Sequence, residues 1–396
     1  MKRDWEIKKL GEVCVFKSGT TIDSKLEKSD GEVIYAKVGD MNLEGNEDYI
    51  TMSSRYVDLK SIKQNQIIPV GSIIFPKRGG AIATNKKRRV IKPTIVDLNT
   101  MALVPSKVID KDYLFFWFKQ IDLSDLSNGT SIPQINNYSF NDVHISYPKS
   151  LSEQQRIVVT LDLAFAAIAK AKANAEQNLK NAKELFESYL QGVFETKGEG
   201  WDEKKLSDLC DTGAGGTPLK SHKDYYEGGN VPWLRSGEVD KKDIIECELY
   251  ITEKGLKNSS ARLFPKNTVL IAMYGATAGQ VGILRFECST NQAVCGILPN
   301  KNIIPEFLYY KFTAGKKALV EQAVGGAQPN ISQIKIKNSI VPNISLREQQ
   351  TIIQKLDALS LETKKLEAIY QQKINDLEEL KKSVLQKAFA GELKTK

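Results

Sequence analysis

Residues 5–14 read Trp-Glu-Ile-Lys-Lys-Leu-Gly-Glu-Val-Cys, and residues 201–210 read Trp-Asp-Glu-Lys-Lys-Leu-Ser-Asp-Leu-Cys. Five of these ten aligned positions are identical, so the chain repeats itself with the offset that separates Trp5 from Trp201. Two copies are too few for a solenoid, which needs about three stacked repeats. The sequence therefore predicts two copies of one domain-sized unit, each with its own core.

The repeat continues through both halves of the chain. Ser72-Ile73-Ile74-Phe75, followed by Gly79, matches Thr268-Val269-Leu270-Ile271, followed by Gly275. Further on, Glu153-Gln154-Gln155 returns as Glu348-Gln349-Gln350. The duplication thus covers most of the 396 residues.

Composition favours an ordinary globular protein, with 41% hydrophobic and 26% charged residues and a net charge of +8. No run approaches the roughly 18 apolar residues of a membrane span, so we expect a cytoplasmic protein. The five cysteines form no CxxC pair, which argues against a disulfide framework or a zinc site. We expect them to be buried, inert thiols.

Each copy begins with short apolar runs separated by Gly, Asn, Asp and Pro, a pattern typical of strands and turns. A helical patch at residues 113–119 interrupts these runs and has a counterpart at residues 307–312. The runs in the first copy are Val33-Ile34-Tyr35, Gln66-Ile67-Ile68, Ser72-Ile73-Ile74-Phe75 and Met101-Ala102-Leu103-Val104. We therefore expect a mixed α/β (α+β) body in each copy.

A purely helical pattern then follows each body. Apolar residues from Leu161 to Val193, Tyr189 included, and from Leu356 to Val384 recur at alternating spacings of three and four. At 1.5 Å per residue, about 40 residues make a helix roughly 60 Å long. One apolar face needs a partner, so the two helices are predicted to pack as an antiparallel coiled coil. The alternative is a helix packed on its own domain.

Catalytic residues are scarce in this sequence. The two histidines, His144 and His222, occupy unrelated positions in the two copies, which disfavours a histidine-based catalytic or metal site in a duplicated enzyme. The glycines at 213–216 lack the Lys-Ser/Thr of a phosphate loop, and Pro218 follows where a helix would start. We predict no catalytic residue, no metal and no cofactor in this chain.

A basic stretch is the clearest candidate binding feature. From Lys77 to Lys92 there are seven basic residues and no acidic one, with Gly79-Gly80 and Thr84-Asn85 between them. Lys and Arg neutralise phosphates, and Asn or Arg can pair with base edges. The aligned stretch of the second copy carries Tyr, Thr and Gln instead, as expected for two units that read different sequences. A solvated charged loop is the alternative for both copies.

Together, these strings resemble the specificity subunit of type I restriction-modification systems. The resemblance covers the whole chain and rests on Glu153-Gln154-Gln155-Arg156-Ile157 with Leu161-Asp162, Glu348-Gln349-Gln350 with Leu356-Asp357, Trp201-Lys204-Leu206, Gly215-Gly216-Thr217-Pro218 and Val231-Pro232-Trp233-Leu234-Arg235-Ser236-Gly237-Glu238. The first copy departs from the pattern, because it has Ser18-Gly19-Thr20-Thr21-Ile22 without the proline and no tryptophan at the position of Trp233.

The resemblance implies two target-recognition domains at residues 1–150 and 198–344, and two conserved helices at 151–197 and 345–396 that set the gap between them. Each domain would read one half of a split, asymmetric DNA site. Two modification subunits would supply S-adenosylmethionine and adenine methylation, and restriction subunits would supply cleavage. The candidate DNA contacts are Lys77, Arg78, Thr84, Asn85, Lys86, Lys87, Arg88, Arg89, Lys220, Arg235, Tyr274, Thr277 and Gln280.

Two rival classes of protein are testable. A methyltransferase fused to its own reader needs catalytic strings that the sequence lacks, and methyl transfer by the purified chain would support it. A duplicated coiled-coil scaffold that binds protein partners without reading DNA would leave the basic stretches unused. Salt-dependent DNA binding separates that scaffold from a DNA reader.

Overall fold

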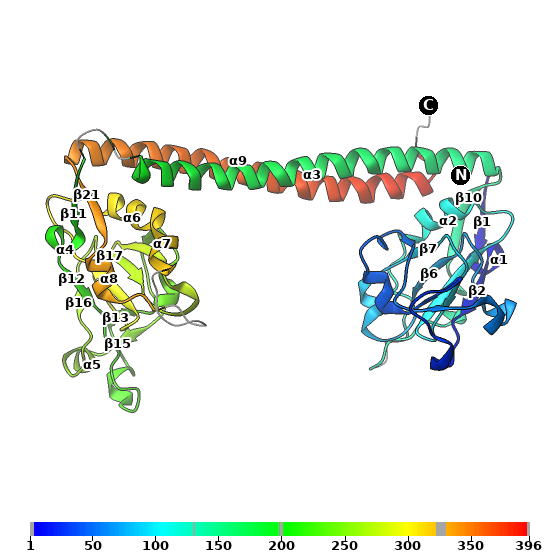
Figure 1. The fold of residues 1–396 in the computed structure, drawn as a ribbon, viewed down its shortest axis with the longest axis horizontal. Helices are drawn as coiled ribbons and strands as arrows, with labels where there is room; N and C mark the ends of the chain where they lie inside the picture. The colour runs from blue at the N-terminus through cyan, green and yellow to red at the C-terminus, as the bar shows by residue number, and fades with distance from the viewer. Residues whose placement is uncertain (1–3, 130, 197, 199–200, 322–329, 394–396) are drawn as a thin grey trace. The chain divides into compact units, whose positions relative to one another are not determined.

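The computed structural model describes residues 4–129, 131–196, 198, 201–321 and 330–393, and it divides into two compact units. Unit 1 comprises Met1–Ala175 and Gln372–Lys396, and unit 2 comprises Glu176–Gln371. Each unit contains one α/β body and part of both long helices (Figure 1). The prediction of two α/β bodies joined by two long helices is confirmed.

Unit 1 is built on a five-stranded sheet in the order β2-β9-β6-β7-β4. Its neighbours are antiparallel except for the parallel pair β4 and β7. A three-stranded sheet in the order β5-β3-β8 and the pair β1-β10 complete the body. The elements are β1 (Trp5–Lys9), α1 (Leu10–Val13), β2 (Cys14–Ser18), β3 (Val33–Ala36), β4 (Tyr49–Ile50), β5 (Tyr56–Val57), β6 (Ile73–Pro76), β7 (Arg88–Val90), β8 (Thr94–Val96), β9 (Thr100–Pro105), α2 (Lys111–Phe118) and β10 (His144–Pro148).

Unit 2 repeats this arrangement, with a five-stranded sheet in the order β12-β20-β17-β18-β14. A four-stranded sheet, β15-β13-β19-β16, and the pair β11-β21 match the smaller sheets of unit 1. The elements are β11 (Asp202–Lys205), α4 (Leu206–Leu209), β12 (Thr212–Ala214), β13 (Val231–Leu234), β14 (Asp243–Ile244), β15 (Tyr250–Ile251), α5 (Glu253–Lys257), β16 (Leu263–Phe264), β17 (Val269–Ala272), β18 (Val281–Leu284), β19 (Cys288–Thr290), β20 (Val294–Ile297), α6 (Pro305–Ala314), α7 (Lys316–Glu321), α8 (Gln333–Lys337) and β21 (Ile340–Asn343).

The expected strands and helical patches are confirmed with one exception. The run at residues 66–68 is not a strand, because Gln64–Gln66 form a 3-10 helix and Ile68 makes a single bridge to Thr94. Ile68 is nevertheless buried, so its side chain contributes to the hydrophobic core although its backbone lies outside the regular strands.

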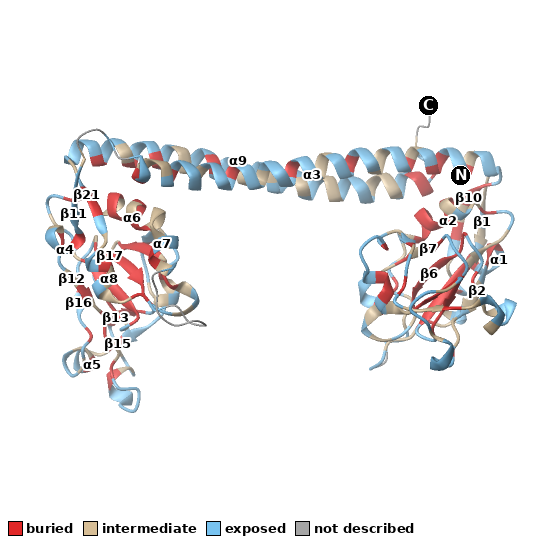
Figure 2. Cartoon of the chain, viewed as in Figure 1, coloured by how far each residue is buried: buried red, intermediate tan, exposed pale blue. Residues whose placement is uncertain are grey.

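The long helices are α3 (Leu151–Glu195) and α9 (Leu346–Phe389). Within unit 1, Lys172 of α3 pairs with Glu378 of α9, and within unit 2 Lys183 of α3 and Glu367 of α9 line one hollow. In unit 1, Phe165 of α3 contacts Lys381 of α9, and the later Lys172 pairs with the earlier Glu378, so the two helices run antiparallel there. Figure 2 shows buried positions in both helices, interspersed with exposed ones.

The predicted antiparallel pairing of the two helices is confirmed, and each helix also packs on the bodies. Leu161 of α3 and Phe389 of α9 join the core of unit 1, and Phe389 lies edge-on to Tyr113 with ring centroids 5.0 Å apart. In unit 2, Phe194 of α3 packs on Phe307 at 5.6 Å. The predicted seam is wrong at Tyr189, Leu366 and Leu380, which are exposed. At the end of α3 the neighbouring Leu190 and Phe194 face the core of unit 2 instead.

A buried glutamine fixes the start of each long helix. The Gln154 side chain accepts from the backbone N–H of Asp110 at 2.7 Å and donates to the carbonyls of Pro148 and Val108 at 2.8 and 3.1 Å. Gln349 does the same in unit 2, accepting from Ile304 at 2.8 Å and donating to Ile344 and Asn302. The repeated Glu-Gln-Gln strings therefore clamp helix to body through a fully bonded buried amide.

Candidate DNA interface

The two main sheets each have an end that lies away from the starts of the long helices. In unit 1, β2 and β6 finish at this end with Ser18 and Pro76, and β9 starts there at Thr100. Helix α3 starts near the opposite end, since Gln154 binds the segment that follows β9. We call this end, with its counterpart at Ala214, Ala272 and Val294 in unit 2, the loop end.

The same backbone scaffold presents different side chains at the two loop ends. The residue after β6, Lys77, accepts a backbone hydrogen bond from Ile135, and Met273 accepts one from Ile331, both at 2.8 Å. The next positions hold exposed Arg78 and exposed Tyr274, which bridge to Gln134 and Asn330. Gly79 and Gly275 follow with φ of +72° in both copies, a conformation that favours glycine.

The predicted DNA contacts of unit 1 fall into two groups. Lys77 and Arg78 lie at the loop end, where the Lys77 ammonium donates to the Ser18 hydroxyl at 3.2 Å. Thr84 is exposed but donates to the Ala81 carbonyl at 2.6 Å. The segment Asn85–Arg89 instead leads into β7, and part of it lines a hollow with Phe165 of α3 and Lys381 of α9.

Two cations of that segment are internal, which corrects their assignment as DNA contacts. Lys87 is 4% exposed and donates to Asn85 Oδ1 and the Ile121 carbonyl, both at 2.7 Å. Burial lowers the pKa of the Lys87 ammonium to about 8. Arg89 is 8% exposed and pairs with Asp112 at 2.8 Å. Neither side chain exposes enough surface for a phosphate contact.

The remaining members of the segment are also held by the fold. Asn85 adopts a left-handed conformation, and its side-chain oxygen accepts from the Leu123 N–H at 3.1 Å. Arg88 is half-buried and donates to the Met41 carbonyl at 2.8 Å. Lys86 contacts Asn42. The interpretation of residues 86–89 as one basic DNA-facing run is therefore wrong at Lys87 and Arg89, which are buried, whereas Lys86 and Arg88 are only partly buried.

The predicted contacts of unit 2 gather at its loop end. Arg235 follows β13 directly, and Lys220 lines the same hollow as Arg235. Tyr274 and Thr277 lie in the turn after β17, and the Gln280 carbonyl accepts from the Ala272 N–H at 2.9 Å. The loop end of unit 2 thus unites Lys220, Arg235, Tyr274, Thr277 and Gln280.

Several residues of that hollow could not be predicted from the sequence. Asn291 and Gln292 follow β19, and Tyr226 lies in a loop without a recognisable motif. Gly215, in the segment after β12, lets the backbone lie close to β19, because a Cβ at Gly215 would lie 2.1 Å from Thr290 Oγ1. These positions become neighbours through the sheet, so spacing along the chain could not have found them.

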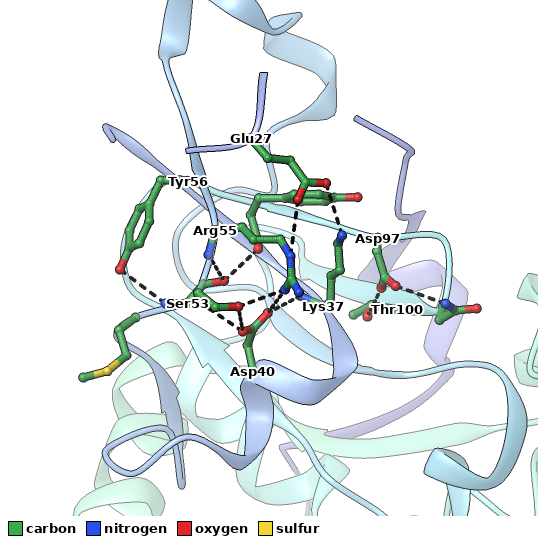
Figure 3. Close-up of polar contacts among 12 residues, drawn as sticks. Glu27, Lys37, Asp40, Ser53, Arg55, Tyr56, Asp97 and Thr100 are labelled. Atoms are coloured by element: carbon green, nitrogen blue, oxygen red, sulfur yellow. Dashed lines mark hydrogen bonds and ion pairs between the residues drawn. The ribbon is translucent and has the colours of Figure 1, made fainter. Parts of the chain in front are cut away.

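Unit 1 fills the matching region with ion pairs (Figure 3). Glu27 accepts from Lys37 at 3.1 Å and pairs with Arg55 at 3.3 Å, while Arg55 also reaches Asp40 at 3.6 Å. Burial favours a raised pKa for the Asp40 carboxyl, but hydrogen bonds from the backbone N–H groups of Lys37 and Ser54 lower it. Asp40 therefore stays charged and anchors the network.

In unit 2, Glu238 corresponds to Asp40 and likewise accepts hydrogen bonds from backbone N–H groups. Glu238 accepts from the backbone N–H groups of Arg235 and Glu248 at 2.8 and 2.9 Å. The Arg235 guanidinium donates to Glu248 at 3.0 Å, and the two side chains are 51% and 70% exposed. An ion pair this exposed is weak, so Arg235 is available to a ligand.

Four cysteines are buried and Cys247 is partly buried, and burial raises the pKa of the Cys14 and Cys295 thiols to about 12. Within the described ranges, no group of three or more His, Cys, Asp or Glu residues is placed to hold a metal ion. None of the helices in the described part of the chain is long and apolar enough to cross a membrane.

Two copies of one α/β body, with conserved scaffolds and divergent loop ends, define a duplicated recognition protein. Residues 2–179 and 198–379 each match the model of the type I restriction modification DNA specificity domain. The chain therefore belongs to that family and contains its domain twice.

Known relatives agree with this assignment. The chain is 24% identical to the type I restriction enzyme MjaIX specificity subunit of Methanocaldococcus jannaschii, over 99% of this chain and 94% of the relative. It is 27% identical to the EcoR124I/EcoR124II specificity subunit of Escherichia coli, over 62% of each chain. The HsdS subunit from Thermoanaerobacter tengcongensis shares the fold, with a TM-score of 0.67 at 18% identity over 99% of this chain and 98% of that one.

Proposed function

We propose that this chain is the sequence-specific DNA-binding subunit of a type I restriction-modification complex. The observation that carries the proposal is that the family domain occurs twice, once on each body, with different side chains on one scaffold. Arg78 in unit 1 and Tyr274 in unit 2 occupy matching positions. Each loop end would then read one half of a bipartite, asymmetric site.

The helices and partners complete this proposal. Helices α3 and α9 would set the number of unread base pairs between the two half-sites. Two modification subunits would carry S-adenosylmethionine and methylate adenine, and restriction subunits would cleave DNA. The chain itself would be non-catalytic and cytoplasmic, with duplex DNA and these subunits as its partners.

A domain exchange tests the proposal. Residues 1–150 are replaced by the first domain of another family member, and methylated adenines are mapped across the genome with and without this gene. We expect one half of the methylated motif to change and the other to stay, because the bodies have separate cores. A change in both halves would contradict independent reading, and the absence of any gene-dependent motif would overturn the function.

A further inference from the structure

The loop end of unit 2 contains a hollow of about 520 Å³ beside Arg235. Tyr226 and Trp233 line it, and we call this pair the aromatic wall; we call Lys220, Lys223, Arg235 and Gln292, which also line it, the rim. Such a space is larger than one planar heterocycle, and the candidate DNA contacts Lys220 and Arg235 line it. It therefore calls for a ligand that combines a flat ring with negative charge.

The aromatic wall is fixed before any ligand arrives. Trp233 is 5% exposed, and its indole N–H donates to the Gly216 carbonyl at 2.9 Å. Tyr226 stands edge-on to Trp233, with centroids 6.2 Å apart, and its hydroxyl donates to the Pro218 carbonyl. Because these side chains are already fixed, little side-chain conformational entropy is lost when a planar group packs against them.

The rim supplies the complementary polar groups. Lys220, Lys223 and Arg235 bring three positive charges to the hollow, against Glu227 on its lining. Asn291 lines the hollow, and its side-chain oxygen is buried without a hydrogen-bond partner among the described residues. A buried acceptor of this kind is stabilised when a ligand donates to it.

Shape decides which part of DNA can enter. Base edges of an intact duplex lie at the floor of a groove about 8.5 Å deep, which a protruding element reaches and a hollow does not. A nucleotide that has turned out of the stack projects from the duplex, with its base flat and its phosphate beside it. Its base would lie against the aromatic wall and its phosphate near the rim lysines.

We propose that the hollow formed by Tyr226, Trp233, Asn291 and Gln292 accepts one nucleotide turned out of the DNA stack. The site belongs to unit 2, because Lys37, Arg55 and Glu27 occupy the matching region of unit 1 as an ion-pair network (Figure 3). This inference rests on the proposed function, since it requires unit 2 to lie on DNA at its loop end.

Fluorescence of 2-aminopurine tests the inference directly. The mapped target duplex is made with 2-aminopurine at each purine position of the half-site read by unit 2, on either strand, and is bound to the full chain without methyltransferase subunits. We expect a several-fold rise at one position, because unstacking relieves quenching. Gln292→Trp, which fills the hollow, should abolish the rise and weaken binding about tenfold.

A second variant and a matched control locate the effect. Tyr226→Leu removes part of the aromatic wall and should reduce the rise, whereas Tyr250→Leu changes an exposed tyrosine that does not line the hollow and should leave it unchanged. The inference is overturned if no position brightens, or if the rise survives both Gln292→Trp and Tyr226→Leu. A wild-type chain that still prefers the mapped duplex over a scrambled one would show that the proposed function stands regardless.

Discussion

In both units an arginine of the main sheet forms an ion pair with the helix that packs on that sheet, α2 in unit 1 and α6 in unit 2. The two arginines occupy different positions along the equivalent strands. In unit 1, Arg89 of β7 pairs with Asp112 of α2 at 2.8 Å and lies between the rings of Tyr49 and Phe115, at 4.1 and 4.3 Å. In unit 2 the matching strand position is Ile283, as the pairings with β6 and β17 show.

Unit 2 moves the cation to the end of the strand. Arg285 follows β18 and pairs with Glu306 of α6 at 2.6 Å and with Asp243. Its side chain is 24% exposed, whereas that of Arg89 is 10% exposed. Both units therefore keep an ion pair between helix and sheet, although different strand positions supply the arginine. Part of the basic run in unit 1 thus has a structural role.

The largest effect that tests this contrast concerns stability. Arg89→Ala should lower the free energy of unfolding of unit 1 by about 3 kcal/mol, because Asp112 would keep a partly buried charge without Arg89 and a cavity would open. Arg285→Ala should cost unit 2 about 1 kcal/mol, since its surroundings are wetter. Hydrogen exchange of the full chain, resolved by unit across a urea series, measures both losses.

A variant that copies unit 2 serves as the control. Arg89→Ile combined with Asp112→Ala removes both charges and fills the strand position with the residue type of Ile283. It should be more stable than Arg89→Ala, because it also removes the Asp112 carboxylate, which would otherwise keep only the exposed Lys111 as an ion-pair partner. Equal losses for Arg89→Ala and Arg285→Ala would show that the two ties are equivalent after all.

The outline of the fold could be predicted from the sequence because its signals are local or repeated. Alternating spacings predicted α3 and α9, and the shared strings predicted two bodies. The role of Gln154 could not be predicted, since Val108 and Asp110 are brought to it by the sheet. Lys87 and Arg89 were wrongly predicted as DNA contacts because a count of charges treats every side chain as exposed to solvent. The alternation of side chains along a strand indicated that some of these residues would face the interior.

A pH series tests a second difference between the units, because the buried ammonium of Lys87 in unit 1 corresponds to Val281 in unit 2. Its pKa in the folded unit is about 8, against an ordinary value of 10.5. Between these values the unfolded chain keeps a proton that the folded unit has released, so stability should rise with pH, by up to about 3 kcal/mol. Below pH 8 both states are protonated and the penalty remains in full.

Lys87→Met provides the reference for this series. The variant lacks the buried ammonium, so unit 1 should be more stable than wild type near pH 7 and should lose most of the rise between pH 8 and 10.5. Unfolding in urea at fixed pH values measures the difference. Parallel curves for wild type and variant would mean that the Lys87 ammonium is well solvated.

DNA binding should separate the two groups of cations in unit 1. Arg78 is exposed at the loop end, whereas Lys86 lies on the segment that leads to β7. Arg78→Ala should reduce the log-log slope of affinity against salt by about 0.9, the value for one lost phosphate contact. Lys86→Ala should leave the slope unchanged. The reverse result would place the DNA on the β7 side of unit 1.

The smallest expected effect concerns the charges between the two long helices. In unit 1, Lys172 of α3 pairs with Glu378 of α9 at 2.6 Å, with side chains 35% and 47% exposed. In unit 2, Lys183 of α3 and Glu367 of α9 line one hollow as a second cation and anion, although Glu187 of α3 and Lys364 of α9 line it too. If two α3 helices from different chains paired antiparallel in the same register, Lys172 of one helix would lie opposite Lys183 of the other. The pattern thus favours α3 with α9 and disfavours α3 with α3.

Charge reversal measures this preference. Lys172→Glu should cost about 0.5 kcal/mol, because an exposed pair is weak, and adding Glu378→Lys should recover most of that loss in a double-mutant cycle. The sharper readout is the isolated helices. A peptide of residues 151–195 should associate with one of residues 346–389 in preference to itself, and Lys183→Glu should relax that preference, since it turns a like-charge pair into an opposite one. Self-association of the unaltered α3 peptide as strong as its pairing with α9 would show that the apolar seam alone selects the partner.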